Sequence, residues 1–146
     1  MVHCLDSEEY KDNPYMQNIH LSQIRRKEWE FTEQSYQPFE AFVMDDFKYM
    51  SDGRMIPQIG FFENEFKYPC VKQKDREWMT VTPNEINTMK EPIALARGNV
   101  LTYGLGLGYY AYMASEKKET ESVTIVDSDH TVIDLFKEEI LPQFKY

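Results

Sequence analysis

Short runs of apolar residues, separated by polar ones, divide the chain into segments of different periodicity. Residues 6–25 predict a helix in which Leu21 and Ile24 contribute to an apolar face and in which Pro14 can cause a break. The runs that follow are rich in aromatic and β-branched residues, which favour strands. Strands are expected at Trp29–Tyr36, Phe39–Met44, Phe47–Met50, Met55–Phe62, Phe66–Val71 and Trp78–Val81.

These strands predict a small antiparallel β meander with mostly local pairings. Its clearest hairpin lies at Asp52-Gly53, between the apolar runs 47–50 and 55–62. Asp-Gly suits a type I′ turn because both central residues of that turn need a positive φ. Trp78 comes at the end of the meander, and we interpret it as a packing residue, with a substrate lid as the alternative.

The pattern becomes helical at Thr82. Residues 82–85, Thr-Pro-Asn-Glu, form a capping box with proline at the first helical position. Pro92 must kink or divide the helix, and Gly98 stands where a left-handed C-terminal cap is expected. The buried face of this helix is predicted to consist of Ile86, Met89 and Ile93.

Strands alternate with helices from residue 99 onwards. This order favours a parallel sheet with right-handed crossovers. We therefore expect an α/β protein with an N-terminal helix plus antiparallel β domain at 1–81 and a second domain with an incomplete parallel sheet at 82–146. The elements expected in the second domain after its first helix are a strand at 100–103, a glycine run at 104–108, a helix at 109–118, a strand at 123–126 and a helix from Asp129 to Pro142.

Composition narrows the class of protein. The 146 residues carry a net charge of −9, which disfavours nucleic acid and anionic membrane surfaces as partners. The aromatic content of 14% is too high for a disordered chain. No apolar run approaches the ~20 residues of a spanning helix, and the first residues lack the features of a signal peptide, so a cytoplasmic location is expected. Cys4 and Cys70 are expected to be free thiols, and no metal site is predicted.

The glycine run carries the strongest indication of function. Glycines directly after a strand let the backbone approach a ligand without an intervening Cβ. Asp127 ends the next strand, 23 residues after Gly104, and suits a carboxylate that accepts hydrogen bonds from ribose hydroxyls. The pattern therefore favours nucleotide binding, although a tight strand–helix turn without a ligand is the simpler alternative.

The spacing of the glycines leaves two registers open. Counted from Gly104 the pattern is GxGxG, whereas counted from Gly106 it fits the dinucleotide fingerprint through Gly108 and Ala111. The second register would bury Gly104 inside a strand, which is unfavourable. It supports an NAD(P)- or flavin-binding oxidoreductase domain as an alternative function. A P-loop is excluded because no Gly-Lys-Ser/Thr follows.

Two segments resemble known motifs. Val100–Gly108 resembles motif I of the class I S-adenosylmethionine-dependent methyltransferases, which have a Rossmann-like fold. Val123–Asp129 resembles the second motif of that family, and the run from Val123 to Pro142 is nearest to its spermidine-synthase-like branch. The resemblance covers roughly residues 83–142, at the separation and in the strand–helix context that the family shows.

The resemblance implies a binding site for S-adenosylmethionine. The three glycines would line the methionine part of this cofactor, Asp127 would hold its ribose, and Ser128 or Asp129 would lie near its adenosine. Thr102 stands where the family often has an acid, and its hydroxyl brings no charge to the cofactor's amino group. The cofactor-binding residues implied are Thr102, Tyr103, Gly104, Leu105, Gly106, Gly108, Asp127 and Ser128.

The family's fold has a seven-stranded sheet, whereas this sequence ends after the second strand and its helix. We therefore expect a truncated version, a fragment of a longer protein, or a homo-oligomer that covers the incomplete sheet. The leading hypothesis is methyl transfer to a small molecule or a protein, with aminopropyl transfer as a variant and catalytic residues unidentified. The non-enzymatic alternative is an interaction module whose open sheet edge pairs with another chain.

Overall fold

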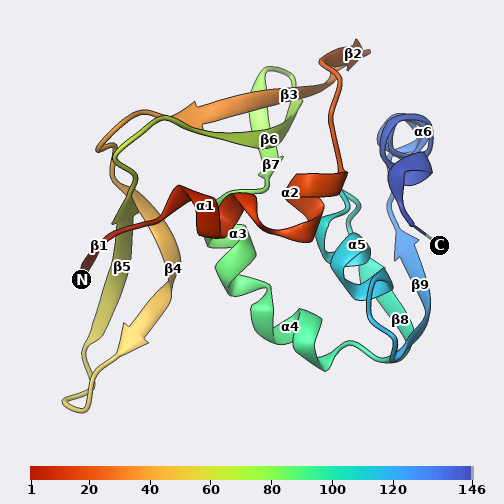
Figure 1. Cartoon of the computed structure of the whole chain (residues 1–146). Coiled ribbons are helices and arrows are strands. Elements are labelled where there is room, and N and C mark those ends of the chain that lie inside the picture. The colour runs from red at the N-terminus through yellow and green to blue at the C-terminus, as the bar shows by residue number, and fades with distance from the viewer. Residues whose placement is uncertain (146) are drawn as a thin grey trace.

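Three separate β-sheets and a set of short helices make up residues 1–145, the part of the chain that the computed structural model describes (Figure 1). Tyr146, the last residue of the predicted second domain, lies outside the described residues. The protein is a mixed α/β structure, as predicted. The strands are β1 Val2–Cys4, β2 Ile24–Arg26, β3 Trp29–Tyr36, β4 Phe42–Tyr49, β5 Met55–Phe61, β6 Phe66–Gln73, β7 Arg76–Thr80, β8 Gly98–Tyr103 and β9 Thr120–Val126.

The helices are all short, and most begin at a recognisable cap. Asn13, Thr82 and Asp129 each accept backbone N–H groups of the first turn that follows. The last helix continues from α-helical into π-helical and 3₁₀ turns. The helices are α1 Ser7–Lys11, α2 Pro14–Asn18, α3 Pro83–Thr88, α4 Lys90–Leu95, α5 Tyr109–Ser115 and α6 His130–Leu135, followed by η1 Phe136–Ile140 and η2 Leu141–Gln143.

The helix predicted for residues 6–25 is correct only in its first part. It breaks before Pro14 as expected, where the Asn13 side chain caps α2. Beyond Asn18 the prediction is wrong, because β2 pairs with β3 and places Ile24 opposite Phe31. The turn of this hairpin contains Lys27 with φ of 54°, a left-handed conformation that no helix contains. Strand pairing thus overrides the local helical pattern.

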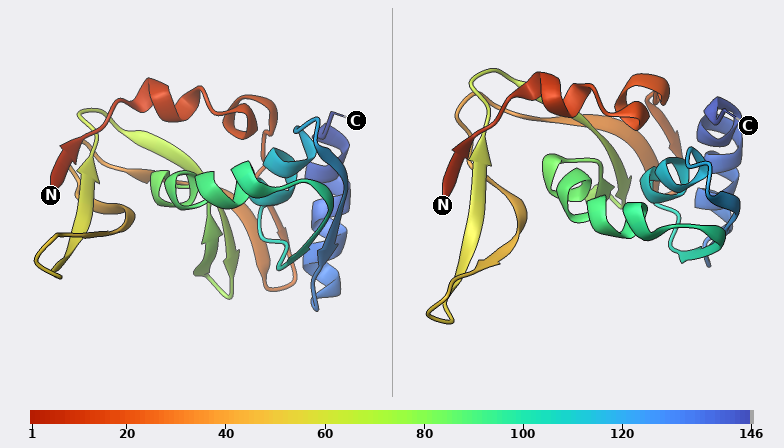
Figure 2. Two further views of the ribbon diagram at one scale, coloured as in Figure 1. Left: turned by 90° about the horizontal axis from the view of Figure 1, so that it is seen from below. Right: turned by 60° about the horizontal axis from the view of Figure 1, so that its bottom comes forward.

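The prediction of a single antiparallel meander is also wrong. One sheet has the order β2-β3-β6-β7, in which β3 pairs with β6 although the β4–β5 hairpin lies between them in sequence. That hairpin forms a second sheet, with β1 parallel to β5. The two strands predicted at 39–44 and 47–50 are one strand, β4, with two register shifts. A turn at Asp52-Gly53 is confirmed, with φ of 84° at Gly53, but it is not type I′, because Asp52 does not have the positive φ which that turn needs. In both views of Figure 2 the β4–β5 hairpin projects from the end opposite β9 and α6.

The helix predicted from Thr82 divides into two, as Pro92 requires. The division comes at Met89, and Pro92 lies in the first turn of α4, where its missing N–H costs little. The Lys117 ammonium donates to the carbonyl oxygens of Ile93, Ala94 and Ala96 at 2.7–2.8 Å and so closes the C-terminal end of α4. Gly98 has the expected positive φ, at the start of β8.

The pair β8–β9 is parallel, as the alternation of strands and helices predicted. Helices α5 and α6 lie on one face, where Ala111 and Ile133 line the same space as Val123 and Ile125. The other face is uncovered among the described residues: Leu101 is 56% exposed and Tyr103 74% exposed. The cluster of buried residues includes side chains on both sides of the predicted domain boundary at 81/82, such as Phe31 and Tyr112.

Candidate functional site

The carboxyl ends of β8 and β9 meet at Gly104 and Asp127. Gly104 follows β8 directly, has φ of 81°, and donates its N–H to the carbonyl oxygen of Val126 at 2.8 Å. A Cβ added at Gly104 would meet no heavy atom within 4 Å, so the backbone is open to a ligand there. Because Gly104 opens the loop and lies outside the strand, the geometry agrees with the register counted from Gly104.

The Asp127 carboxylate connects the two loops. Its Oδ2 accepts the N–H of Leu105 at 2.9 Å, and its Oδ1 accepts the N–H of Asp129 at 2.9 Å. Each carboxylate oxygen has a second lone pair, which can accept a hydrogen bond from a hydroxyl group of a ligand. Asp127 therefore has a structural role, and that role holds its carboxylate at the end of β9, the position that ribose recognition requires.

A hollow of about 510 Å³ opens at this point. Four of the predicted cofactor-binding residues line it: Tyr103, Gly104, Asp127 and Ser128. The remaining lining residues are Val126 and Asp129 beside them, and Trp29, Gln73 and Trp78 from the β2-β3-β6-β7 sheet. The site is thus built from both of the predicted domains.

The other predicted cofactor-binding residues lie on the side of the glycine run that faces the interior of the protein. Thr102, Leu105 and Gly108 line a small cavity of about 40 Å³, enough for water but not for the methionine part of a cofactor. Gly106 packs against the side chain of Met79, and Gly108 against the ring of Phe136, so closely that neither position has space for a Cβ. The three glycines therefore differ, and only Gly104 faces the hollow.

Glu85 lines the small cavity together with Thr102. Burial raises the pKa of its carboxyl above the ordinary value of 4.5. The capping-box pattern explains its place at the start of α3, where Thr82 accepts its N–H at 3.5 Å, but gives no indication that its side chain lies beside the glycine run. Glu85 brings to this cavity the carboxylate that Thr102 lacks.

Trp78, interpreted as a packing residue, is 63% exposed and so lies outside the core. It meets Trp29 edge to face, with ring centroids 6.3 Å apart. Trp29 itself is only 4% exposed. The sequence pattern gives no indication that Trp29 and Gln73 belong to the site, because they reach it through pairing of β3 with β6, where they are register partners.

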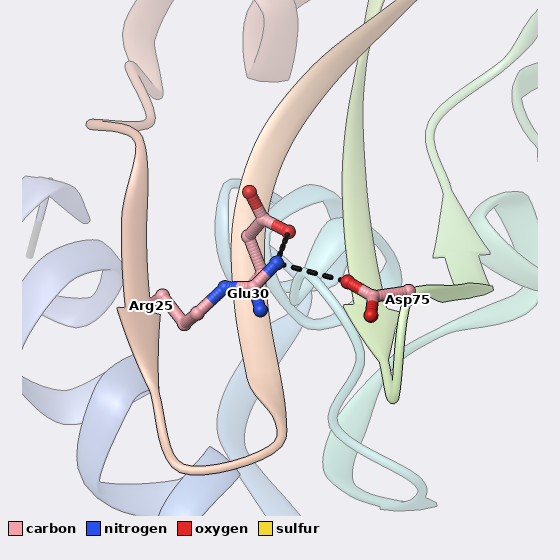
Figure 3. Close-up of polar contacts among 3 residues, drawn as sticks. All are labelled: Arg25, Glu30 and Asp75. Carbon is pink, nitrogen blue, oxygen red and sulfur yellow. Dashed lines mark hydrogen bonds and ion pairs between the residues drawn. The ribbon is translucent and has the colours of Figure 1, made fainter.

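Polar contacts hold this end of the β2-β3-β6-β7 sheet. Arg25 of β2 contacts Glu30 of β3 and Asp75 of the β6–β7 turn, each at 2.9 Å (Figure 3). The Gln73 amide donates to the Glu28 carboxylate at 2.8 Å. These contacts join the β2–β3 hairpin to the β6–β7 hairpin beside Trp29 and Gln73, which line the hollow.

Helix α2 supports the glycine run from the other side. The Tyr15 hydroxyl donates to the carbonyl oxygen of Leu107 at 2.6 Å, and the Asn13 amide donates to the Tyr109 hydroxyl at 2.9 Å. Tyr15 is fully buried, and burial raises its pKa, so it remains a neutral hydrogen-bond donor. Tyr15 also contacts the rings of Tyr109 and Tyr112 edge to face. The loop is therefore held by packing before any ligand binds.

Two further features, a metal-ligating cluster and a membrane-spanning helix, do not occur within residues 1–145. No group of three or more His, Cys, Asp or Glu side chains there is arranged to hold a metal ion. No helix in the same range combines the length and apolar character of a membrane span. Comparison of the chain with protein-family models, with curated proteins and with solved structures yields no match.

Proposed function

We propose that this chain carries the adenosyl-binding part of an S-adenosylmethionine-dependent methyltransferase with a Rossmann-like fold. The observation that carries the proposal is the meeting of Gly104 and Asp127 at the carboxyl ends of two adjacent parallel strands, beside a hollow of about 510 Å³. In parallel α/β sheets this is the place where ligands bind. The substrate is a small molecule or a protein.

The residues around the hollow fit the nucleoside part of this cofactor. Gly104 leaves open the space that a Cβ would fill, and the Asp127 oxygens are held at the strand end as hydrogen-bond acceptors. The cofactor, when bound, supplies an already activated methyl group, so the protein's contribution is to bind, orient and exclude water. Asp127 would bind the ribose hydroxyls, while Ser128 and Tyr103 line the same hollow.

The methionine part requires a local rearrangement. Met79 packs on Gly106, and the cavity beside Thr102 and Glu85 is small. Movement of the Met79 side chain, which is partly exposed and flexible, would enlarge that cavity next to the Glu85 carboxylate. Glu85 then offers the negative charge that a cationic amino group needs. Aminopropyl transfer would use a related sulfonium donor in the same place.

The experiment is a thermal melt with and without S-adenosylhomocysteine. At about 100 times its dissociation constant the ligand stabilises the native state by about 2.7 kcal/mol, which raises Tm by several degrees. Asp127→Asn should raise the dissociation constant roughly 10- to 150-fold, since a hydrogen bond to a charged group contributes about 1.5–3 kcal/mol. The matched control is Asp134→Asn, an exposed aspartate on α6. A melt that does not move at any ligand concentration would contradict the proposal.

A second candidate is an interaction module. It is favoured by the exposed apolar side chains on the open face of β8–β9, where Val126 is 44% exposed beside Leu101 and Tyr103. A face of this kind is typical of surfaces that contact another chain, including a second copy. A stable dimer that gives no shift with S-adenosylhomocysteine would support this function over methyl transfer.

A further inference from the structure

Three aromatic side chains from two different sheets meet at the hollow. Trp29 and Trp78 come from β3 and β7, and Tyr103 comes from the end of β8. Trp78 and Tyr103 leave most of their ring surface in solvent. Exposed aromatic rings beside a concave site are suited to a planar, π-rich ligand, which stacks on them and removes them from water.

The buried ring of this group has an unused donor. The Nε1 of Trp29 is buried and has no hydrogen-bond partner within residues 1–145. Buried donors in native proteins nearly always have an acceptor, and this one has almost no accessible surface, so a ligand in the hollow would meet it only after the Trp29 ring moves.

The carboxylates that line the hollow determine which charge a ligand can carry there. Asp127 and Asp129 line the hollow, and the described lining includes no lysine or arginine. Carboxylates accept hydrogen bonds from hydroxyl groups but repel phosphates, which bind at sites that supply positive charge. The Asp127 carboxylate already holds the backbone of both loops, so it cannot turn away from the ligand without breaking those contacts.

We propose that this hollow binds an unphosphorylated purine nucleoside, with its base against Trp78 and Tyr103 and its sugar hydroxyls on Asp127. The inference deepens the function proposed above and rests on it, because it names which part of the cofactor binds here and which residues recognise the base. It assigns recognition of the base to the β2-β3-β6-β7 sheet, although these residues carry no part of the resemblance to the family. It also distinguishes this site from a binding site for NAD or ATP, because both of those ligands carry phosphates, which the carboxylates repel.

Intrinsic fluorescence tests the inference directly. The chain has two tryptophans, and both line the hollow, so any change in their emission reports on this site. The whole chain is titrated with adenosine, with S-adenosylhomocysteine, and with AMP and ADP. We expect saturable quenching by the first two and dissociation constants at least tenfold weaker for AMP and ADP.

Two variants and a control locate the base. Trp78→Ala should weaken adenosine binding at least tenfold, and Trp78→Phe, which keeps a ring, should recover part of the loss. Binding by these variants is followed through the emission of Trp29 and by calorimetry. The control is Tyr49→Ala, which removes another exposed aromatic ring, from the β4–β5 hairpin at the opposite end of the molecule (Figures 1 and 2).

The outcomes separate this inference from the proposed function. If S-adenosylhomocysteine raises Tm but leaves the emission and the Trp78→Ala affinity unchanged, the base lies elsewhere and only the inference is overturned. If adenosine quenches but S-adenosylhomocysteine does not bind, the nucleoside site holds and the methyltransferase proposal fails. Equal binding of ADP and adenosine would overturn the selection by charge. Absence of binding by every ligand would overturn both.

Discussion

The antiparallel pair β3–β6 and the parallel pair β8–β9 differ in how much of their side-chain surface the protein covers. The first pair is in register over eight residues, and its side chains Phe31, Phe66 and Val71 are fully buried. The second pair is shorter, and every second residue of it faces solvent, including Leu101 and Tyr103. Burial on one side only is ordinary for antiparallel sheets but unusual for parallel ones.

This difference in burial separates residues that stabilise the fold from residues that are free to bind a ligand or another chain. Side chains of β3 and β6 contribute to the free energy of folding through burial, and substitutions there create cavities. The apolar face of β8–β9 contributes little in the same way, and its residues are accessible to a ligand or to another chain. Tyr103 shows the consequence, because it is both one of the most exposed aromatic residues and part of the hollow.

The largest expected effect comes from comparing one residue of each pair. Phe31→Ala should lower the free energy of unfolding by about 3–5 kcal/mol, since it removes a fully buried ring. Leu101→Ala should change it by no more than about 0.5 kcal/mol, since Leu101 is exposed. Equilibrium unfolding in urea, monitored by circular dichroism, measures both.

A large loss of unfolding free energy in Leu101→Ala would contradict the difference between the two strand pairs. If that loss shrinks as the protein is diluted, the open face is covered by a second copy in solution, because association stabilises the native state by mass action and this stabilisation disappears at low concentration. Sedimentation of the unsubstituted protein at the same concentrations would then show a dimer. Equal losses at both positions without dilution dependence would mean that exposure does not distinguish the two pairs.

The two regions also differ in how far their sequence predicts them. For β8 and β9 the order strand–glycine run–helix–strand is local, so the parallel pairing and the positions of Gly104 and Asp127 followed directly from it. In the β2-β3-β6-β7 sheet, β3 and β6 were both placed correctly along the chain, but their pairing was not predicted, because nothing local shows that the β4–β5 hairpin forms a separate sheet. Non-local pairing is what the pattern of apolar residues cannot show.

The candidate site shows the same limit. Tyr103, Gly104, Asp127 and Ser128, which the resemblance grouped as site residues, line one hollow. Trp29 and Gln73 could not be included, because their place at the hollow depends on the β3–β6 register. Gly106 was expected beside a ligand and lies instead against Met79 of β7, a contact between regions that no local motif indicates.

A smaller effect is expected at the polar contact that fastens the second region to α4. Lys117→Met keeps the aliphatic stem but removes the ammonium that donates to three carbonyl oxygens. The free energy of unfolding should fall by about 1.5–3 kcal/mol, the range for hydrogen bonds from a charged group. Its neighbour Lys118 is exposed and provides the matched control, Lys118→Met, which should have little effect. Equal losses in the two variants, measured by urea unfolding, would contradict the role of Lys117.

The smallest effect should come from Glu85, which lies between the two regions at the start of α3. Burial raises the pKa of its carboxyl, so the native state holds this proton more tightly than the unfolded chain does. The contribution of Glu85 to stability therefore decreases as the pH rises from the ordinary value of 4.5 through the raised pKa. Glu85→Gln removes the buried charge and should make the protein more stable at pH 7, with a difference that disappears in acid below both pKa values. Glu91→Gln, at an exposed position of α4, should show no such trend. Thermal melts at a series of pH values measure the difference, and a Gln variant that is less stable at pH 7 would show that the carboxylate has a favourable partner in the folded protein.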